Sequence, residues 1–195
     1  DVIGVKDRLD PVLVGSYGVG RSVNTIFVRG SYAYLTTSDN LRELMVLDIK
    51  DKAHPSVATI FDAPLNDALG NNSGLGKSAF VINQKIYLGR AHSFSNNDPE
   101  FLVLDETDIT LPLLQSKDIG TTQNPDSVNN IIVSNELVFV LSNKRFHIFD
   151  ASTINLWSVN LLQGTGKSFT CFQDAFYVAV NSLQPSEESM LIITP

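Results

Sequence analysis

The stretch VNTIFVRGSYAYLTTSDNLRELMVLDIKDKAHPSVATIFDAP, residues 23–64, decides the fold. It holds four short apolar runs, rich in β-branched and aromatic residues, and each run is bounded by Gly, Asn, Asp, Ser or Pro. This composition is typical of strands joined by turns, and no run has the apolar spacing of a helix over ~10 residues. The stretch therefore predicts a four-stranded up-and-down sheet whose two faces need a cover. The four runs are residues 26–28, 32–35, 44–49 and 57–61.

The rest of the chain repeats this unit and so supplies the cover. The second run, Ala33–Leu35, recurs at residues 86–88, 138–140 and 176–178. The third run, 44–48, recurs at residues 101–105, 146–150 and 190–194. The mean period of ~49 residues lies in the range of propeller blades. Four-stranded sheets that repeat at this period and pack face to face around an axis predict an all-β fold, a β-propeller.

The repeats predict a single propeller domain over residues 1–195, with four blades of four antiparallel strands each. Residues 12–14 have the pattern of a fourth strand without its own blade, and the sequence ends after a third strand. We expect the N- and C-terminal strands to pair, because this closes the ring and removes two open sheet edges. Residues 2–5 duplicate the third strand of the last blade and favour a longer parent protein, so an arc of a larger propeller is the alternative. The predicted blades are 22–64, 76–118, 126–162, and 166–195 plus 11–17.

The pattern VxGxYAYL…LxVLDIxDxxxPxxV, which begins at Val28, resembles the LVIVD repeat, a bacterial propeller repeat. The resemblance is best over residues 28–57 and looser at 81–114, 133–159 and 171–194. The chain is also similar to propeller regions attached to bacterial type IV prepilin-like surface proteins. These resemblances imply an extracellular or cell-surface location, and a non-enzymatic module for binding, display or adhesion on a pilin-like protein. The implied partner is a protein or glycan surface ligand that the sequence does not identify.

The composition of the chain also excludes some classes of partner. A net charge of −7 argues against a nucleic-acid groove, which needs clustered Lys and Arg. No run approaches ~18 apolar residues, so we expect no membrane span within this chain, and no motif indicates a cofactor. The single cysteine, Cys171, aligns with Val28 and is predicted to be a buried thiol. Trp157, in a fourth strand, is expected to pack against a blade, and the alternative is an exposed aromatic.

Two Gly-Lys-Ser triplets, at 76–78 and 166–168, do not form P-loops. A P-loop needs a glycine five positions before the Gly of the Gly-Lys pair, and here those positions hold Asn71 and Leu161. We therefore reject nucleotide binding.

Alignment of the repeats predicts a different role for these two lysines. Lys77 and Lys167 fall at the same blade position as Asn24 and Asn129, at the start of the innermost strand. The four side chains are predicted to ring one mouth of the channel, where two lysines would attract an anion or a carboxylate. The alternative is that both lysines stay hydrated.

Two loops, 38–43 and 95–100, are rich in acidic and amide side chains. Oxygen ligands at this density can hold Ca²⁺, but the spacing fits no EF-hand loop, and turns use Asp and Asn for other reasons. We expect no metal site, with Asp39, Glu43, Asp98 and Glu100 as the candidates for calcium. The longest connection, residues 65–74, is a candidate recognition loop or a solvated linker.

We find no catalytic set and expect no enzyme. Asp48, Asp105 and Asp150 recur at the end of the third strand, too far apart to act as an acid/base pair, so each is expected to cap its own turn. The histidines, His54, His92 and His147, lack metal-ligand spacing. Alternation predicts that His147 points away from its two neighbours in sequence. Two alternatives stay open: an enzyme at the channel mouth, and a structural spacer or self-assembly unit. The sequence leaves the ligand and the oligomeric state undecided.

Overall fold

The computed structural model describes residues 1–7, 9–63, 74–92, 98–120, 123–173, 175–181 and 190–193. All regular elements within these ranges are β-strands, seventeen in number, which confirms the all-β prediction. They form three four-stranded antiparallel sheets, one three-stranded sheet and one hairpin. The larger sheets run up and down in chain order, as the repeat predicts, and we call them blades 1 to 4.

The strands follow the apolar runs closely. Blade 1 contains β3 (Val23–Arg29), β4 (Tyr32–Thr37), β5 (Leu44–Asp48) and β6 (Ser56–Phe61). Blade 2 contains β7 (Gly76–Ile82), β8 (Lys85–Arg90), β9 (Phe101–Asp105) and β10 (Leu113–Lys117). Blade 3 contains β11 (Val128–Ser134), β12 (Leu137–Ser142), β13 (Arg145–Asp150) and β14 (Leu156–Leu161). Blade 4 contains β15 (Thr165–Phe172), β16 (Ala175–Asn181) and β17 (Met190–Ile193), and the hairpin contains β1 (Val2–Gly4) and β2 (Val12–Gly15).

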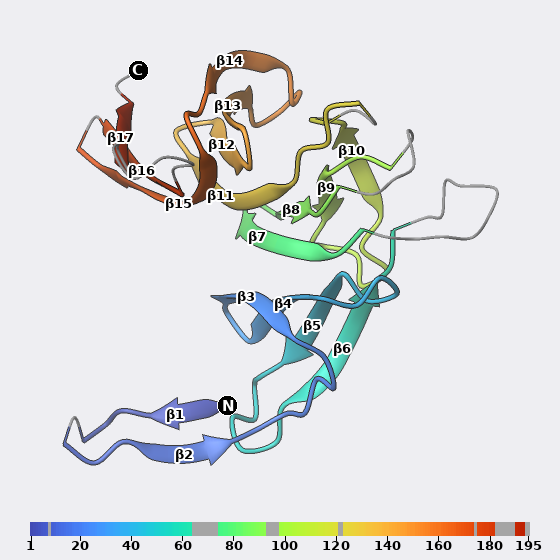
Figure 1. Cartoon of the computed structure of the whole chain (residues 1–195). Coiled ribbons are helices and arrows are strands. Elements are labelled where there is room, and N and C mark those ends of the chain that lie inside the picture. The colour runs from blue at the N-terminus through green and yellow to red at the C-terminus, as the bar shows by residue number, and fades with distance from the viewer. Residues whose placement is uncertain are drawn as a thin grey trace.

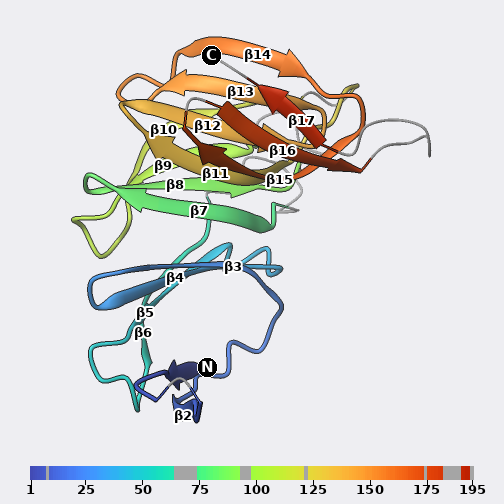
Figure 2. The same cartoon turned by 90° about the vertical axis from the view of Figure 1, so that its left-hand side faces the viewer.

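The blades follow one another along an open arc (Figures 1 and 2). The first strands of the blades, β3, β7, β11 and β15, contact one another in sequence order. They lie on the inner side of the arc, and the third and fourth strands lie further out.

The predicted pairing of residues 11–17 with the last strand is wrong. β2 instead pairs with β1, with Gly4 opposite Val12, and both views place this hairpin at the opposite end of the arc from β17. A local hairpin fixes far fewer intervening residues than a strand pair across the whole chain, and so costs less chain entropy. The end of β2 is also held against blade 1, because a Cβ on Gly15 would lie 2.2 Å from the carbonyl oxygen of Lys52.

Blades 1 to 3 each pack through one face on the next blade. We call this the front face of a blade, and the face toward the preceding blade its back face. The third strands show the pattern: Leu44, Phe101 and Phe146 are fully buried in the cores of the 1–2, 2–3 and 3–4 interfaces. Aromatic contacts join the blades, such as Phe146 to Phe169, whose ring centroids are 5.1 Å apart. Burial of these side chains between sheets is the main source of stability.

Candidate functional site

The four predicted channel residues occupy one structural position. The ladder between the first and second strands of each blade skips one residue, and that residue is Asn24, Lys77, Asn129 or Lys167. Such a β-bulge re-aims a side chain and is common next to functional sites. The equivalence read from the repeats is therefore correct. All four residues lie on the inner strands of an open arc, without the closed ring that the prediction assumed.

The two asparagines hold blades together. Asn24 Nδ2 donates to the carbonyl oxygen of Gly76 at 2.6 Å, and Asn129 Nδ2 donates to that of Gly166 at 2.7 Å. Each bond joins a bulge to the residue before the bulge of the next blade. The amides are thereby committed to the 1–2 and 3–4 interfaces.

The two lysines have no such partner within the described part of the chain. Lys77 is half-buried and Lys167 is exposed. Both Gly-Lys-Ser triplets lie inside first strands, β7 and β15, and not in a strand–loop–helix unit. The binding of an anion by the two lysines stays a prediction.

An arginine lies between the carboxylates proposed for calcium. Arg90, at the end of β8, donates to Glu43 Oε1 at 2.7 Å and also pairs with Asp98. All three side chains are buried. Burial raises the pKa of Glu43, and the Arg90 guanidinium opposes this rise. Glu43 further accepts a bond from the backbone N–H of Ala63 at 2.7 Å.

The other two candidates bind groups of the chain itself. Glu100 Oε2 accepts bonds from the N–H groups of Ile119 and Gly120, and its Oε1 lies 2.5 Å from His92 Nδ1. Asp39 pairs with Arg42 at 3.0 Å. Within the described ranges, no group of three or more His, Cys, Asp or Glu is placed to hold a metal. Residues 95–97 and most of the predicted recognition loop, 65–73, lie outside the described residues.

The recurring aspartates cap their turns, as predicted. Asp48 Oδ1 accepts from Lys50 N at 2.8 Å, and Asp105 Oδ1 accepts from Thr107 N at 2.8 Å. Asp150 accepts from the backbone and hydroxyl groups of the next turn, which lowers its pKa to about 2.

Three single residues complete the comparison with prediction. Cys171 is exposed, so its predicted burial is wrong. Trp157 is 70% exposed, which agrees with the alternative of an exposed aromatic. Both line a groove of about 240 Å³ between blades 3 and 4, which the packed sheets leave open. His147 points away from Phe146 and Ile148, as alternation predicts, and its ring stacks on Phe149 at 5.6 Å.

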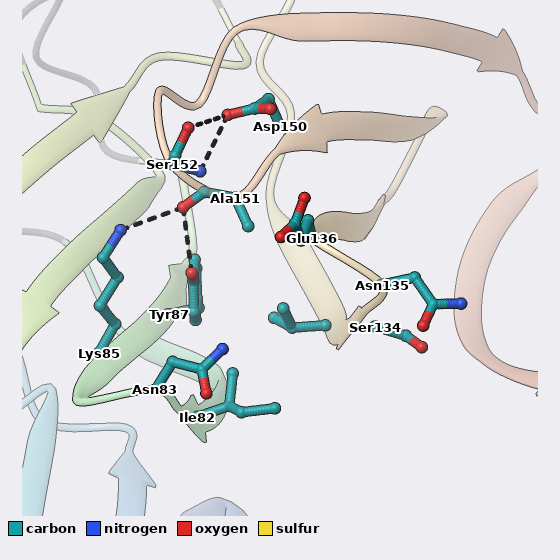
Figure 3. A pocket seen from close by; sticks show the side chains of 11 residues that line it. Ile82, Asn83, Lys85, Tyr87, Ser134, Asn135, Glu136, Asp150, Ala151 and Ser152 are labelled. Atoms are coloured by element: carbon teal, nitrogen blue, oxygen red, sulfur yellow. Dashed lines mark hydrogen bonds between the residues drawn. The ribbon is translucent and has the colours of Figure 1, made fainter.

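A cavity with both polar and apolar walls lies between blades 2 and 3, with a volume of about 380 Å³ (Figure 3). Two hairpin turns form its rim, one between β7 and β8 and one between β11 and β12. Asn83 and Asn135 have φ values of 52° and 50°, and the residues after them are also left-handed. This is the type I′ conformation that suits two-residue hairpins and favours Asn. The lining residues are Ile82, Asn83, Lys85, Tyr87, Val133, Ser134, Asn135, Glu136, Asp150, Ala151 and Ser152.

The floor of this cavity is fixed by a shared acceptor. The carbonyl oxygen of Ala151 accepts from Lys85 Nζ and from Tyr87 OH, each at 3.2 Å. The rim residues differ, because the side chains of Asn83, Asn135 and Glu136 make no hydrogen bond among the described residues (Figure 3). The cavity thus combines a rigid floor with free polar groups. Sequence patterns indicated the turns, but not that turns of two different blades share one cavity.

At the equivalent position between blades 1 and 2, the polar side chains bind one another directly. Tyr34 occupies the blade position of Tyr87, and its hydroxyl donates to Glu106 Oε1 at 2.6 Å. Arg29 Nη1 lies 2.5 Å from the other oxygen of the same carboxylate. Here the polar groups are paired with one another, so the 2–3 cavity is the better candidate for a ligand.

Comparisons with known proteins support the fold. The LVIVD repeat model matches residues 20–63, and a search of curated proteins finds no significant match. The computationally designed protein Ika4 superposes with a TM-score of 0.65 at 11% identity, over 94% of this chain and 97% of its own. BamB from Moraxella catarrhalis gives 0.56 at 15% identity, over 80% of this chain and 44% of BamB. The chain covers 42% of another designed protein, Ika8, at a TM-score of 0.59 and 13% identity.

At these identities the structural likeness establishes the fold alone, a β-propeller. The chain spans less than half the length of BamB and Ika8 and nearly all of Ika4. Within the described residues, no helix is long and apolar enough to cross a membrane. A propeller fold by itself leaves the function open, because function depends on the sites that the fold carries.

Proposed function

We propose that the protein is a non-enzymatic module at the bacterial cell surface, and that the cavity between blades 2 and 3 binds a glycan. The observation that carries the proposal is the rim of Asn83, Asn135 and Glu136, whose polar groups are free and held on rigid turns. A volume of about 380 Å³ is enough for a small ligand.

The chemistry of the rim favours a hydroxyl-rich ligand. Amide groups donate and accept at once, and a carboxylate accepts from two hydroxyls, so together they match the donors and acceptors of a sugar. Tyr87 closes the floor, with a side chain that is 2% exposed. The net charge of −7 disfavours strongly anionic ligands. A neutral glycan fits these conditions better than a phosphorylated or nucleic-acid ligand.

A glycan array followed by calorimetry with the best ligand tests this assignment. The variant pair Asn83→Gly and Asn135→Gly keeps the left-handed turns, because glycine adopts positive φ freely, and removes both amides. We expect affinity to fall at least tenfold. Gln84→Gly is the matched control, since Gln84 has a φ of 62° in the same turn but does not line the cavity. The proposal fails if no glycan binds, or if the paired variant binds as well as the control.

The surface location, and adhesion with it, rests on the sequence resemblance to prepilin-attached propellers. Protease treatment of intact cells tests it, because a surface protein is cleaved while a cytoplasmic marker survives. Protection equal to that of the marker would refute the location without touching the glycan assignment.

A hydrolase is the second candidate, at a cavity of about 330 Å³ lined by Asp118, Arg145 and His147. Partial burial and the nearby Glu100 carboxylate raise the pKa of Asp118 to about 6, which suits a general acid. Turnover in a hydrolase substrate panel that is lost in Asp118→Asn would favour this candidate. If no substrate is turned over, the hydrolase is rejected and the non-enzymatic binding module is retained.

A further inference from the structure

The last blade exposes positions that the other blades bury. Met190 aligns with Leu44, Phe101 and Phe146, which are fully buried on the front faces of blades 1 to 3, yet Met190 is 54% exposed. Ile192 is 59% exposed, although its counterparts Val46, Val103 and Ile148 are buried.

The same holds for the second strand of blade 4. Tyr177 occupies the position from which Tyr34, Tyr87 and Phe139 reach the next blade, and nearby Phe172 is exposed. Among the described residues, nothing covers the front face of blade 4, which is thus an apolar surface with the residue types of a blade interface.

On blade 1 it is the back face that exposes apolar side chains which the other blades bury. Ile26 is 62% exposed, whereas its counterparts Ala79, Ile131 and Phe169 are buried against the preceding blade. Val28 is 56% exposed, whereas Val81 and Val133 are buried. Tyr17 and Val19 cover the part of this face near β5, so the uncovered area lies along β3. No element within the described ranges covers it.

We propose that these two faces bind each other between copies of this chain, with the front of blade 4 packed head to tail on the back of blade 1. The argument is continuity with an existing interface, because the chain itself repeats front-on-back packing three times with the same residue classes. Apolar side chains exposed at both ends of the arc, on Met190 and Ile192 at one end and Ile26 and Val28 at the other, drive the contact. A head-to-tail contact is heterologous, and it closes into a ring where the rotation allows.

Light scattering of the purified chain over a range of concentrations tests the association. We expect a mass of two chains or a larger whole multiple, and at least a tenfold weaker association for Ile26→Glu or Ile192→Glu. Ile109→Glu is the matched control, since Ile109 is equally exposed but lies on neither end face. A monomer at every concentration would overturn the proposal, as would small-angle scattering that shows one chain closed on itself.

Mixing the two variants tests the head-to-tail geometry. Ile26→Glu keeps an intact front face and Ile192→Glu keeps an intact back face. Each variant alone should associate at least tenfold more weakly than the wild type, and their mixture should form a one-to-one complex with nearly wild-type affinity. Self-association of either variant at wild-type strength would overturn the geometry, and a mixture that associates no better than the single variants would do the same. Circular dichroism on each variant separates these outcomes from misfolding.

Discussion

The guanidinium Nη2 of Arg90 lies 2.7 Å from Oε1 of Glu43, so a side chain of blade 2 neutralises a carboxylate of blade 1 that has no exposure to water. Asp98 pairs with the same guanidinium from the loop before β9. One cation therefore connects two blades and a loop. Its removal would leave two carboxylates in a site that water does not reach.

Arg90→Met should destabilise the protein by about 3–5 kcal/mol, because a buried charge without its partner is costly. Chemical denaturation measures the loss. Arg42→Met is the control, since the Arg42 side chain is 40% exposed and Asp39 keeps Arg21 as a second partner, so removal of this ion pair should cost about 1 kcal/mol or less. Similar losses for both variants would show that the buried network is not a major source of stability.

Gly76→Ala should also destabilise the protein, by several kcal/mol. A Cβ at this position would lie 1.9 Å from the carbonyl oxygen of Glu43, which is backbone and cannot move aside easily. Gly18→Ala tests the same change where no atom lies within 4 Å, and its melting temperature should stay near that of the wild type. Equal stability of the two variants would mean that blades 1 and 2 do not approach closely at β7.

Tyr34→Phe should cost about 1.5–3 kcal/mol, the usual range for a hydrogen bond to a charged group. Burial and the hydrogen bond to Glu106 raise the pKa of the Tyr34 phenol, so it stays a donor through neutral and alkaline pH. Tyr32→Phe is the control on the same strand. A spectroscopic titration of the wild type that shows Tyr34 ionising with the exposed tyrosines would contradict the contact.

His147 should make stability fall on acidification. Burial, aided by the nearby Arg145, lowers the pKa of His147 from 6.5 to about 4. Between these values the unfolded chain binds the proton and the folded chain does not, so the free energy of unfolding decreases as pH drops from 6.5 toward 4.

His147→Phe keeps the ring contact with Phe149 and should flatten the pH dependence of stability in that interval. His54→Gln is the control, because His54 is exposed. An unchanged slope in His147→Phe would show that His147 titrates alike in both states. Asp118 acts in the opposite sense, because its raised pKa lets the folded state hold a proton that the unfolded chain has released.

The repeat predicted much of the fold because strand and turn signals are local. The caps at Asp48, Asp105 and Asp150 were predictable for the same reason, as each carboxylate bonds within its own turn. The equivalence of Asn24 and its counterparts followed from alignment of the blades, whereas the bulge at their position did not. These features depend either on residues that are close in sequence or on the repeat period of the blades, and both can be read from the sequence.

The remaining features depend on competition between distant segments. The sequence pattern allowed β2 to pair with either β1 or β17. In the structure it pairs with β1, which is much closer in sequence. Arg90 and Glu43 are 47 residues apart, and no spacing rule links them, although the glutamate at the same place in blades 1 and 2 was a usable signal. The exposure of Cys171 depends on what packs beside its strand, which alternation alone does not tell.

The groove between blades 3 and 4 contains two residues that can serve as a fluorescence probe pair. The sequence has one cysteine and one tryptophan, and both line this groove. A thiol-reactive dye on the native Cys171 would therefore sit beside the sole indole, Trp157, without any engineered residue. Energy transfer between them would follow the separation of these two blades in real time.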